Sequence, residues 1–127
     1  WDVSSVTNME SMFQDASAFD QDIGGWDTSR VESMAGMFEY ATSFSYHLGA
    51  WDISSVVNAR FFLKEVGLST KAYDATLAGW ASSPDPPRDL ELHADGLTYC
   101  ASAPARQRLI DEFGWTFHSD EQDCSAP

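Results

Sequence analysis

The sequence predicts an α/β fold: a short solenoid with a parallel strand ladder on one side, helices on the other, and a C-terminal α/β cap. Three observations support this prediction. A Trp-Asp pair recurs every 25 residues, apolar positions recur in the same register after each pair, and a different pattern that contains both cysteines follows the last repeat. A period in this range, held without insertion, is typical of a solenoid in which each unit buries its neighbour's apolar face.

Each repeat begins with Trp-Asp-x-Ser-x-Val and continues with an apolar stripe. The stripe has the spacing i, i+3, i+4, i+7 in Met9, Met12, Phe13, Ala16 and in Met34, Met37, Phe38, Ala41. This spacing predicts an amphipathic helix, and Asn8, Ser33 and Asn58 stand before it as N-cap residues. Residues 19–23 and 44–48 are each expected to form one short strand. The Asp and Ser of the Trp-Asp-x-Ser turn are expected to bond nearby backbone.

The C-terminal segment departs from the repeat and predicts a mixed cap. A helix is expected over about 71–80, capped by Ser69 or Thr70, and a strand around Leu90 and Leu92. A second helix is expected from Pro104 to 113, with Gly114 ending it, before a last strand at 115–117. We therefore expect three repeats in residues 1–66, the third incomplete, and a capping segment in 67–127, in one continuous domain. Because the pattern opens in mid-repeat, upstream repeats of the same parent chain are expected partners.

The two cysteines, Cys100 and Cys124, lie near the ends of expected elements in a chain with no other thiol. A disulfide between them is the favoured interpretation, and two free thiols are the alternative. Such a bond would pin the cap that covers the last apolar face of the solenoid.

The repeat resembles a known family. The string WDVSSVTNMESMF at 1–13, followed by AFDQDI at 18–23, is similar to the BspA-like leucine-rich-repeat surface proteins, first grouped with mycoplasma lipoprotein repeats. The similarity covers residues 1 to about 66, and the third repeat departs from it because Ala59 to Leu63 replace the Met frame. Tyr73-Asp74, Gly79-Trp80 and Tyr99-Cys100 resemble the segment that ends such arrays in large bacterial surface proteins.

The resemblance implies a leucine-rich-repeat-like solenoid with an extracellular role, at a cell surface or secreted, in adhesion or protein–protein contact. Members of this family share no catalytic residues, so the resemblance transfers none to this chain.

The charge of the chain excludes several classes of partner. Twenty Asp and Glu against seven Lys and Arg give a net charge of −13, and the acids are spread over both halves. An acidic surface repels polyanions, so nucleic acid and anionic membranes are not expected partners. Membrane insertion is not expected either, since no stretch approaches the roughly 20 apolar residues that span a bilayer.

The sequence offers no constellation for catalysis. Its histidines share no metal-ligand spacing, and no nucleophile-elbow context or glycine-rich phosphate loop is present. We expect no enzyme, no catalytic residue, no cofactor and no metal. A structural calcium ion near Asp15, Asp20, Asp22 and Asp27 is the alternative, although the next repeat replaces Asp20 and Asp22 with Ser45 and His47.

One contrast between the repeats suggests a ligand site. The apolar positions are the same in the first and second repeats, whereas Asp20, Gln21 and Asp22 of the first are replaced by Ser45, Tyr46 and His47 in the second. Because these positions fall on the expected strands, we expect them on an exposed strand face, the surface that repeat proteins use for binding. The alternative interpretation is drift at solvated positions. The leading hypothesis is a binding or adhesion module that contacts a surface protein or glycan of another cell; the runner-up is a structural spacer or cap.

Overall fold

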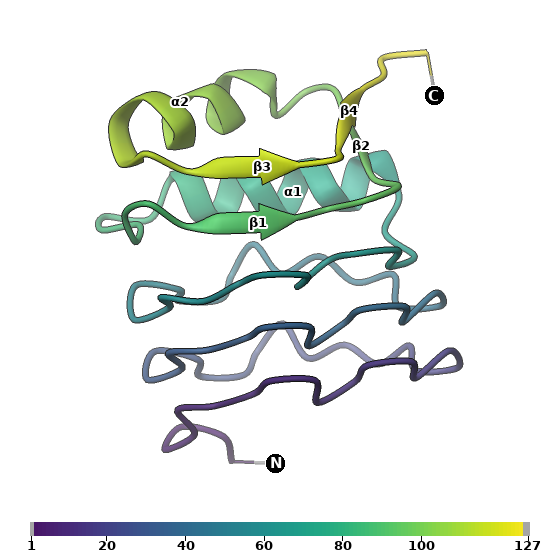
Figure 1. Cartoon of the computed structure of the whole chain (residues 1–127), viewed down its shortest axis with the longest axis vertical. Helices are drawn as coiled ribbons and strands as arrows, with labels where there is room; N and C mark the ends of the chain where they lie inside the picture. The colour runs from purple at the N-terminus through teal and green to yellow at the C-terminus, as the bar shows by residue number, and fades with distance from the viewer. Residues whose placement is uncertain (1, 126–127) are drawn as a thin grey trace.

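The structure, a computed structural model, describes residues 2–125. Its helices and strands all lie in the C-terminal half: α1 (Thr70–Ala81), β1 (Glu91–His93), β2 (Thr98–Tyr99), α2 (Ala103–Phe113), β3 (Thr116–His118) and β4 (Glu121–Gln122). The three repeats form coils that stack one on the next, with the C-terminal elements at the end of the stack (Figure 1).

A parallel ladder joins the coils along one side. Single bridges pair Asn8 with Ser33 and Ser33 with Asn58, and a further bridge pairs Ala59 with Leu92 of β1. β1 in turn pairs in parallel with β3, and β2 with β4. The front of the stack in Figure 1 therefore continues from the repeats into β1 and β3. The ladder therefore crosses residue 66, where the sequence predicts the boundary between the repeats and the capping segment. That boundary stays a prediction.

The described residues of the repeats form none of the expected helices, and that prediction was wrong. The apolar stripes lie instead in what we call the ladder segments, residues 8–16, 33–41 and 58–66. In the first, the N–H groups of Met9, Ser11, Phe13 and Asp15 donate to carbonyls of the next coil, over 2.8–2.9 Å. The N–H groups of the residues between them bond within their own coil. The Met12 N–H, for example, donates to the Met9 carbonyl over 3.3 Å.

Left-handed residues explain why the apolar spacing misleads. Each ladder segment holds two residues with positive φ, four apart: Ser11 and Asp15, then Gly36 and Tyr40, then Phe61 and Glu65. A turn every four residues places apolar side chains at nearly the same intervals as a helix does. An α-helix, however, bonds its N–H groups to its own carbonyls four residues back, so it would leave no donors for the neighbouring coil.

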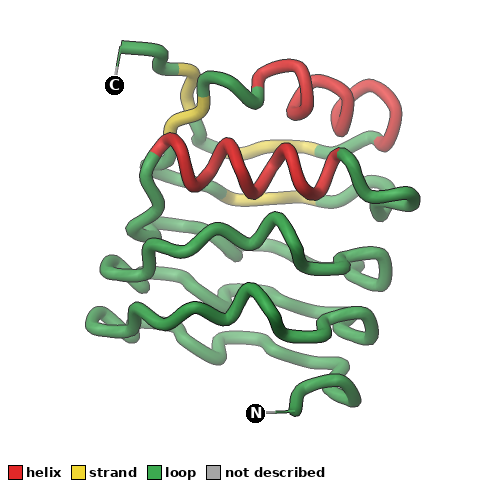
Figure 2. Tube along the Cα trace, turned by 180° about the vertical axis from the view of Figure 1, so that it is seen from behind, coloured by secondary structure: helices red, strands yellow, loops and turns green. Residues whose placement is uncertain are grey.

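The strands expected at 19–23 and 44–48 are also absent, because the ladder runs through the other side of each coil. We call 19–25 and 44–50 the return segments. No backbone hydrogen bond joins these two segments among the described residues; stacked rings of Phe19 and Phe44, 5.6 Å apart, pack them together. Seen from behind, α1 lies next in line after the return segments (Figure 2).

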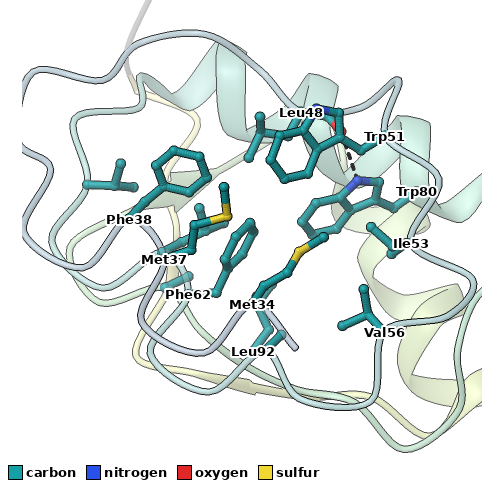
Figure 3. Close-up of a cluster of buried hydrophobic side chains, with 14 of the residues drawn as sticks. Met34, Met37, Phe38, Leu48, Trp51, Ile53, Val56, Phe62, Trp80 and Leu92 are labelled. Atoms are coloured by element: carbon teal, nitrogen blue, oxygen red, sulfur yellow. Dashed lines mark hydrogen bonds between the residues drawn. The ribbon is translucent and has the colours of Figure 1, made fainter. Parts of the chain in front are cut away.

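Aromatic columns fill the space between the ladder and return sides. Phe38, fully buried, stacks on Phe13 at 5.5 Å and meets Phe62 edge-on at 5.4 Å. Trp51 Nε1 donates to the Ile23 carbonyl and Trp80 Nε1 to the Leu48 carbonyl, both over 2.9 Å. Ile23 and Leu48 are equivalent in the repeat, so α1 places Trp80 where another coil would place its own Trp (Figure 3).

The expectations for the C-terminal elements are confirmed. Ser69 caps α1 by accepting from the Ala72 N–H over 3.1 Å, and Gly114 ends α2 in the left-handed conformation with φ 72°, as a C′ glycine does. The strands fall at Leu92 and Phe117 as expected. Cys100 and Cys124 form a disulfide, with their Cα atoms 5.0 Å apart. The expected Asp-Ser turns are confirmed too: Asp27 Oδ1 accepts from both the N–H and the Oγ of Ser29.

Candidate functional site

The six residues singled out from the sequence, Asp20, Gln21, Asp22, Ser45, Tyr46 and His47, lie on the return segments and are exposed. The expectation that they share the ladder face was wrong, because the ladder forms through a different segment of each coil. That they bind a ligand stays a prediction. Asp20 already serves the stacking of the coils, because its Oδ1 accepts from the N–H and the Oγ of Ser45, over 3.0 and 2.7 Å.

The structure brings three of these residues against α1. Ser45, Tyr46 and His47 line a hollow of about 380 Å³ together with Ser69 and residues of the first turns of α1. We call it the return-side hollow. The Tyr46 side chain is 39% exposed, and His47 Nδ1 accepts from the Gly49 N–H over 3.3 Å. This hollow is mostly apolar, with Lys71 as its one charged lining residue.

A second hollow, of about 420 Å³, opens on the ladder face. We call it the ladder-side hollow. It lies over Gly36, which occupies the same position in its coil as Ser11 and Phe61 do in theirs, and all three have positive φ. With no side chain at Gly36, the column has a gap, although Gly36 itself is buried. Ser11 Oγ, Glu39 Oε1 and Gln14 Nε2 lie 3.5–3.9 Å from the place its Cβ would take. Polar side chains surround this gap: Glu10, Gln14, Glu39, Asn58 and Arg60.

Phe61 forms one wall of the ladder-side hollow and is the last ring of an aromatic stack. The residue is 41% exposed; its ring stacks on His93 with centroids 4.4 Å apart, and His93 stacks on His118 at the same distance. The Phe61 N–H donates to His93 Nδ1 over 3.0 Å. Burial and the neighbouring His118 lower the pKa of His93, so at neutral pH its Nδ1 keeps the lone pair that this bond requires.

The polar rim of the ladder-side hollow is ordered by bonds between coils. Gln14 Nε2 donates to Glu39 Oε1 over 2.5 Å, and Ser33 Oγ donates to Glu10 Oε1 over 2.7 Å. Arg60 Nε lies 3.2 Å from Glu91 Oε2, in an exposed ion pair. Lys64 Nζ lies 5.7 Å from the Phe61 ring centroid and 5.5 Å from that of Tyr40. These side chains offer both donors and acceptors around one aromatic face.

Sequence reasoning did not single out the ladder-side hollow. A signal for it was present: one position of the ladder segment changes from Ser11 to Gly36 to Phe61 between repeats. That change becomes meaningful only once the segment is known to be a ladder, because in a helix these positions would not stack on one another.

Neither a metal-binding cluster nor a membrane-spanning helix is found within residues 2–125. Within this range no three His, Cys, Asp or Glu side chains gather as they would around a metal ion. None of the helices formed there is long and apolar enough to cross a bilayer.

The fold and its hollows define a stacked-coil protein with open, solvent-facing hollows on its ladder side and its return side. The chain belongs to the family described as "Mycoplasma protein of unknown function, DUF285", whose model matches residues 1–82. The match covers all three coils and the whole of α1. No curated protein and no solved structure matches the chain.

Proposed function

We propose that this chain is a leucine-rich-repeat-like solenoid of the BspA-like kind that binds a protein or glycan of another cell through its ladder face. In this proposal it is a non-catalytic, extracellular adhesion module of a larger bacterial surface protein. The observation that carries the proposal is the ladder-side hollow, where Phe61 is 41% exposed beside a rim of polar side chains. Partly exposed aromatic rings with a polar rim are typical of binding surfaces.

The stacked architecture supports the choice of face. The ladder is held by a regular series of backbone bonds between coils, so side chains on it keep fixed positions relative to one another. A site on such a scaffold holds its geometry without ordering a loop when the ligand arrives, which lowers the entropic cost of binding.

One observation favours the runner-up, a structural spacer or cap without a ligand. Asp20 and Ser45, two of the residues expected to bind a ligand, use their polar atoms in a bond between coils. Under this alternative, the differences between repeats on the return side serve only the stacking of one coil on the next.

A binding screen separates the two functions. The purified chain is immobilised and exposed to an array of cell-surface proteins and glycans, with calcium and with a chelator. We expect saturable binding that Phe61→Ala weakens and that Tyr46→Ala and Val57→Ala leave unchanged. Val57, 79% exposed, is a matched apolar control that lines neither hollow. Weakening by Tyr46→Ala alone would move the site to the return-side hollow, and silence across the array would favour the spacer.

A further inference from the structure

The ladder-side hollow lies at the end of a stack of three rings. His118, His93 and Phe61 lie face to face along the ladder, with 4.4 Å between successive centroids. The next position in the column is Gly36, which has no side chain, so the stack stops at Phe61. Both Phe61 and Gly36 line the hollow. A flat group the size of one ring would continue the stack and cover apolar surface of Phe61.

Charged side chains of both signs lie around the gap. Glu10, Glu39 and Arg60 line the hollow, and Lys64 Nζ lies 5.7 Å from the Phe61 ring centroid. A singly charged ligand would be attracted by some of these groups and repelled by others, and it would also lose part of its hydration on entering. A neutral ligand with hydroxyl groups has no such desolvation cost for a charge.

The rim also favours a ligand that donates and accepts hydrogen bonds at several places. Glu10 and Glu39 each use Oε1 in a bond between coils, which leaves Oε2 of each as an acceptor for a ligand. Arg60 holds Glu91 through Nε, so its terminal nitrogens are available as donors. Hydroxyl groups both donate and accept, and a ligand that carries several of them satisfies both kinds of partner.

We infer that the ladder-side hollow binds one pyranose residue of a neutral glycan, with the apolar face of the sugar ring against Phe61. Its hydroxyl groups donate to Glu10 and Glu39 and accept from Arg60. A pyranose combines a flat face of C–H groups with a rim of hydroxyls, which matches an aromatic wall beside mixed polar side chains. The inference rests on the proposed function and narrows its ligand from protein or glycan to neutral glycan.

The test uses the full chain and defined neutral sugars. An array of neutral oligosaccharides identifies the preferred terminal residue, and its methyl pyranoside is then titrated against the ¹⁵N-labelled protein. We expect the amide resonances of Gly36, Phe61 and Glu39 to shift. Phe61→Ala should weaken binding about tenfold or more, as the loss of a central contact does. Phe61→Tyr, which keeps the ring, should restore it, and Glu39→Gln should weaken it less.

Two controls keep the test decisive. Unchanged melting temperatures show that Phe61→Ala and Phe61→Tyr still fold, and Tyr46→Ala should bind as the parent chain does. Because the ligand is uncharged, its affinity should be the same at about 0.05 and 0.5 M salt, whereas a charged peptide would bind more weakly at high salt. If proteins on the array bind but neutral glycans do not, the inference fails and the proposed function stands. If nothing binds, both fail; if sugars bind equally to Phe61→Ala, the inference fails.

Discussion

The first three coils and the C-terminal part of the molecule share one core but are held together in different ways. The coils, residues 2–66, repeat the same small interactions: a ladder bond, an Asp-Ser turn and an aromatic contact recur every 25 residues. The C-terminal part, 67–125, continues the ladder through β1 and β3 and adds interactions that the coils lack. These are the disulfide and an ion pair between Arg106 and Asp120.

The unique interactions cluster where the stack ends. Asp120 accepts two bonds from Arg106, over 2.9 and 2.7 Å, and a third from Tyr73 Oη over 2.7 Å. The Arg106 guanidinium also lies 4.6 and 4.5 Å from the ring centroids of Tyr99 and Phe117. The difference teaches that a stack of similar units spreads its stability over many weak terms, whereas its last unit, covered on one side only, concentrates stability in a few.

The largest effect should come from the disulfide. Replacing both Cys100 and Cys124 with Ser removes a link between residues 24 apart, and the chain-entropy model puts the loss at about 3–4 kcal/mol of unfolding free energy. Urea denaturation of the double variant against the oxidised parent measures this loss. The parent under reducing conditions is the control and should behave as the variant does. An unchanged midpoint would show that the coils alone carry the stability.

The next effect concerns the buried ion pair. The Asp120 side chain is 1% exposed and that of Arg106 is 17% exposed, so Asp120→Asn leaves a largely buried guanidinium without its counter-charge. We expect a loss of about 3 kcal/mol of unfolding free energy, measured by urea denaturation. Asp27→Ala, which removes one exposed turn from the coils, is the comparator and should cost clearly less. Equal losses at the two sites would contradict the contrast between the regions.

The junction between the two regions should be sensitive to a single methyl group. A Cβ on Gly79 of α1 would overlap the backbone carbonyl of Gly49, whereas one on Gly25 would meet nothing within 4 Å. Alanine favours a helix over glycine by about 1 kcal/mol, but overpacking costs about 1–3 kcal/mol. We therefore expect Gly79→Ala to lower the melting temperature. Gly25→Ala is the control and should leave it nearly unchanged; a stabilised Gly79→Ala would show that α1 can move away from the coils.

The smallest effect is a dependence of stability on pH at the ladder, where the two regions meet. His93 faces His118, Arg60, Glu91 and Asp95, and its pKa is lowered from 6.5 mainly by burial and then by His118. The folded state therefore binds fewer protons than the unfolded state. The contribution of His93 to the free energy of unfolding is complete above about pH 6.5. It is lost as the pH falls through the pKa that His93 has in the folded state.

Melting curves between pH 7.5 and pH 5 test this dependence, because protonation of His93 also removes its bond from the Phe61 N–H. His93→Gln, which does not titrate, should flatten the decline over that interval. A decline of the same size in the variant would assign it to other groups.

The C-terminal elements could be predicted from the sequence because their signals are local. Ser69 before an apolar stripe, Pro104 at a helix start and Gly114 at a helix end each act within a turn of chain. The Asp-Ser turns are local in the same sense, since acceptor and donor stand two residues apart. The sequence favours the disulfide over two free thiols because Cys100 and Cys124 lie near the ends of expected elements in a chain of extracellular character.

The sequence by itself determined the 25-residue repeat, the apolar columns and the elements of the last coils. Only the tertiary structure decided that 8–16, 33–41 and 58–66 are ladder segments and not helices, and therefore that Phe61 and Gly36, not Tyr46 and His47, share the ladder face. The physical reason lies in where the backbone donors go. The N–H groups of Met9 and Phe13 donate to carbonyls of the next coil. This hydrogen bonding can replace that of a helix only where a neighbouring coil supplies the carbonyls.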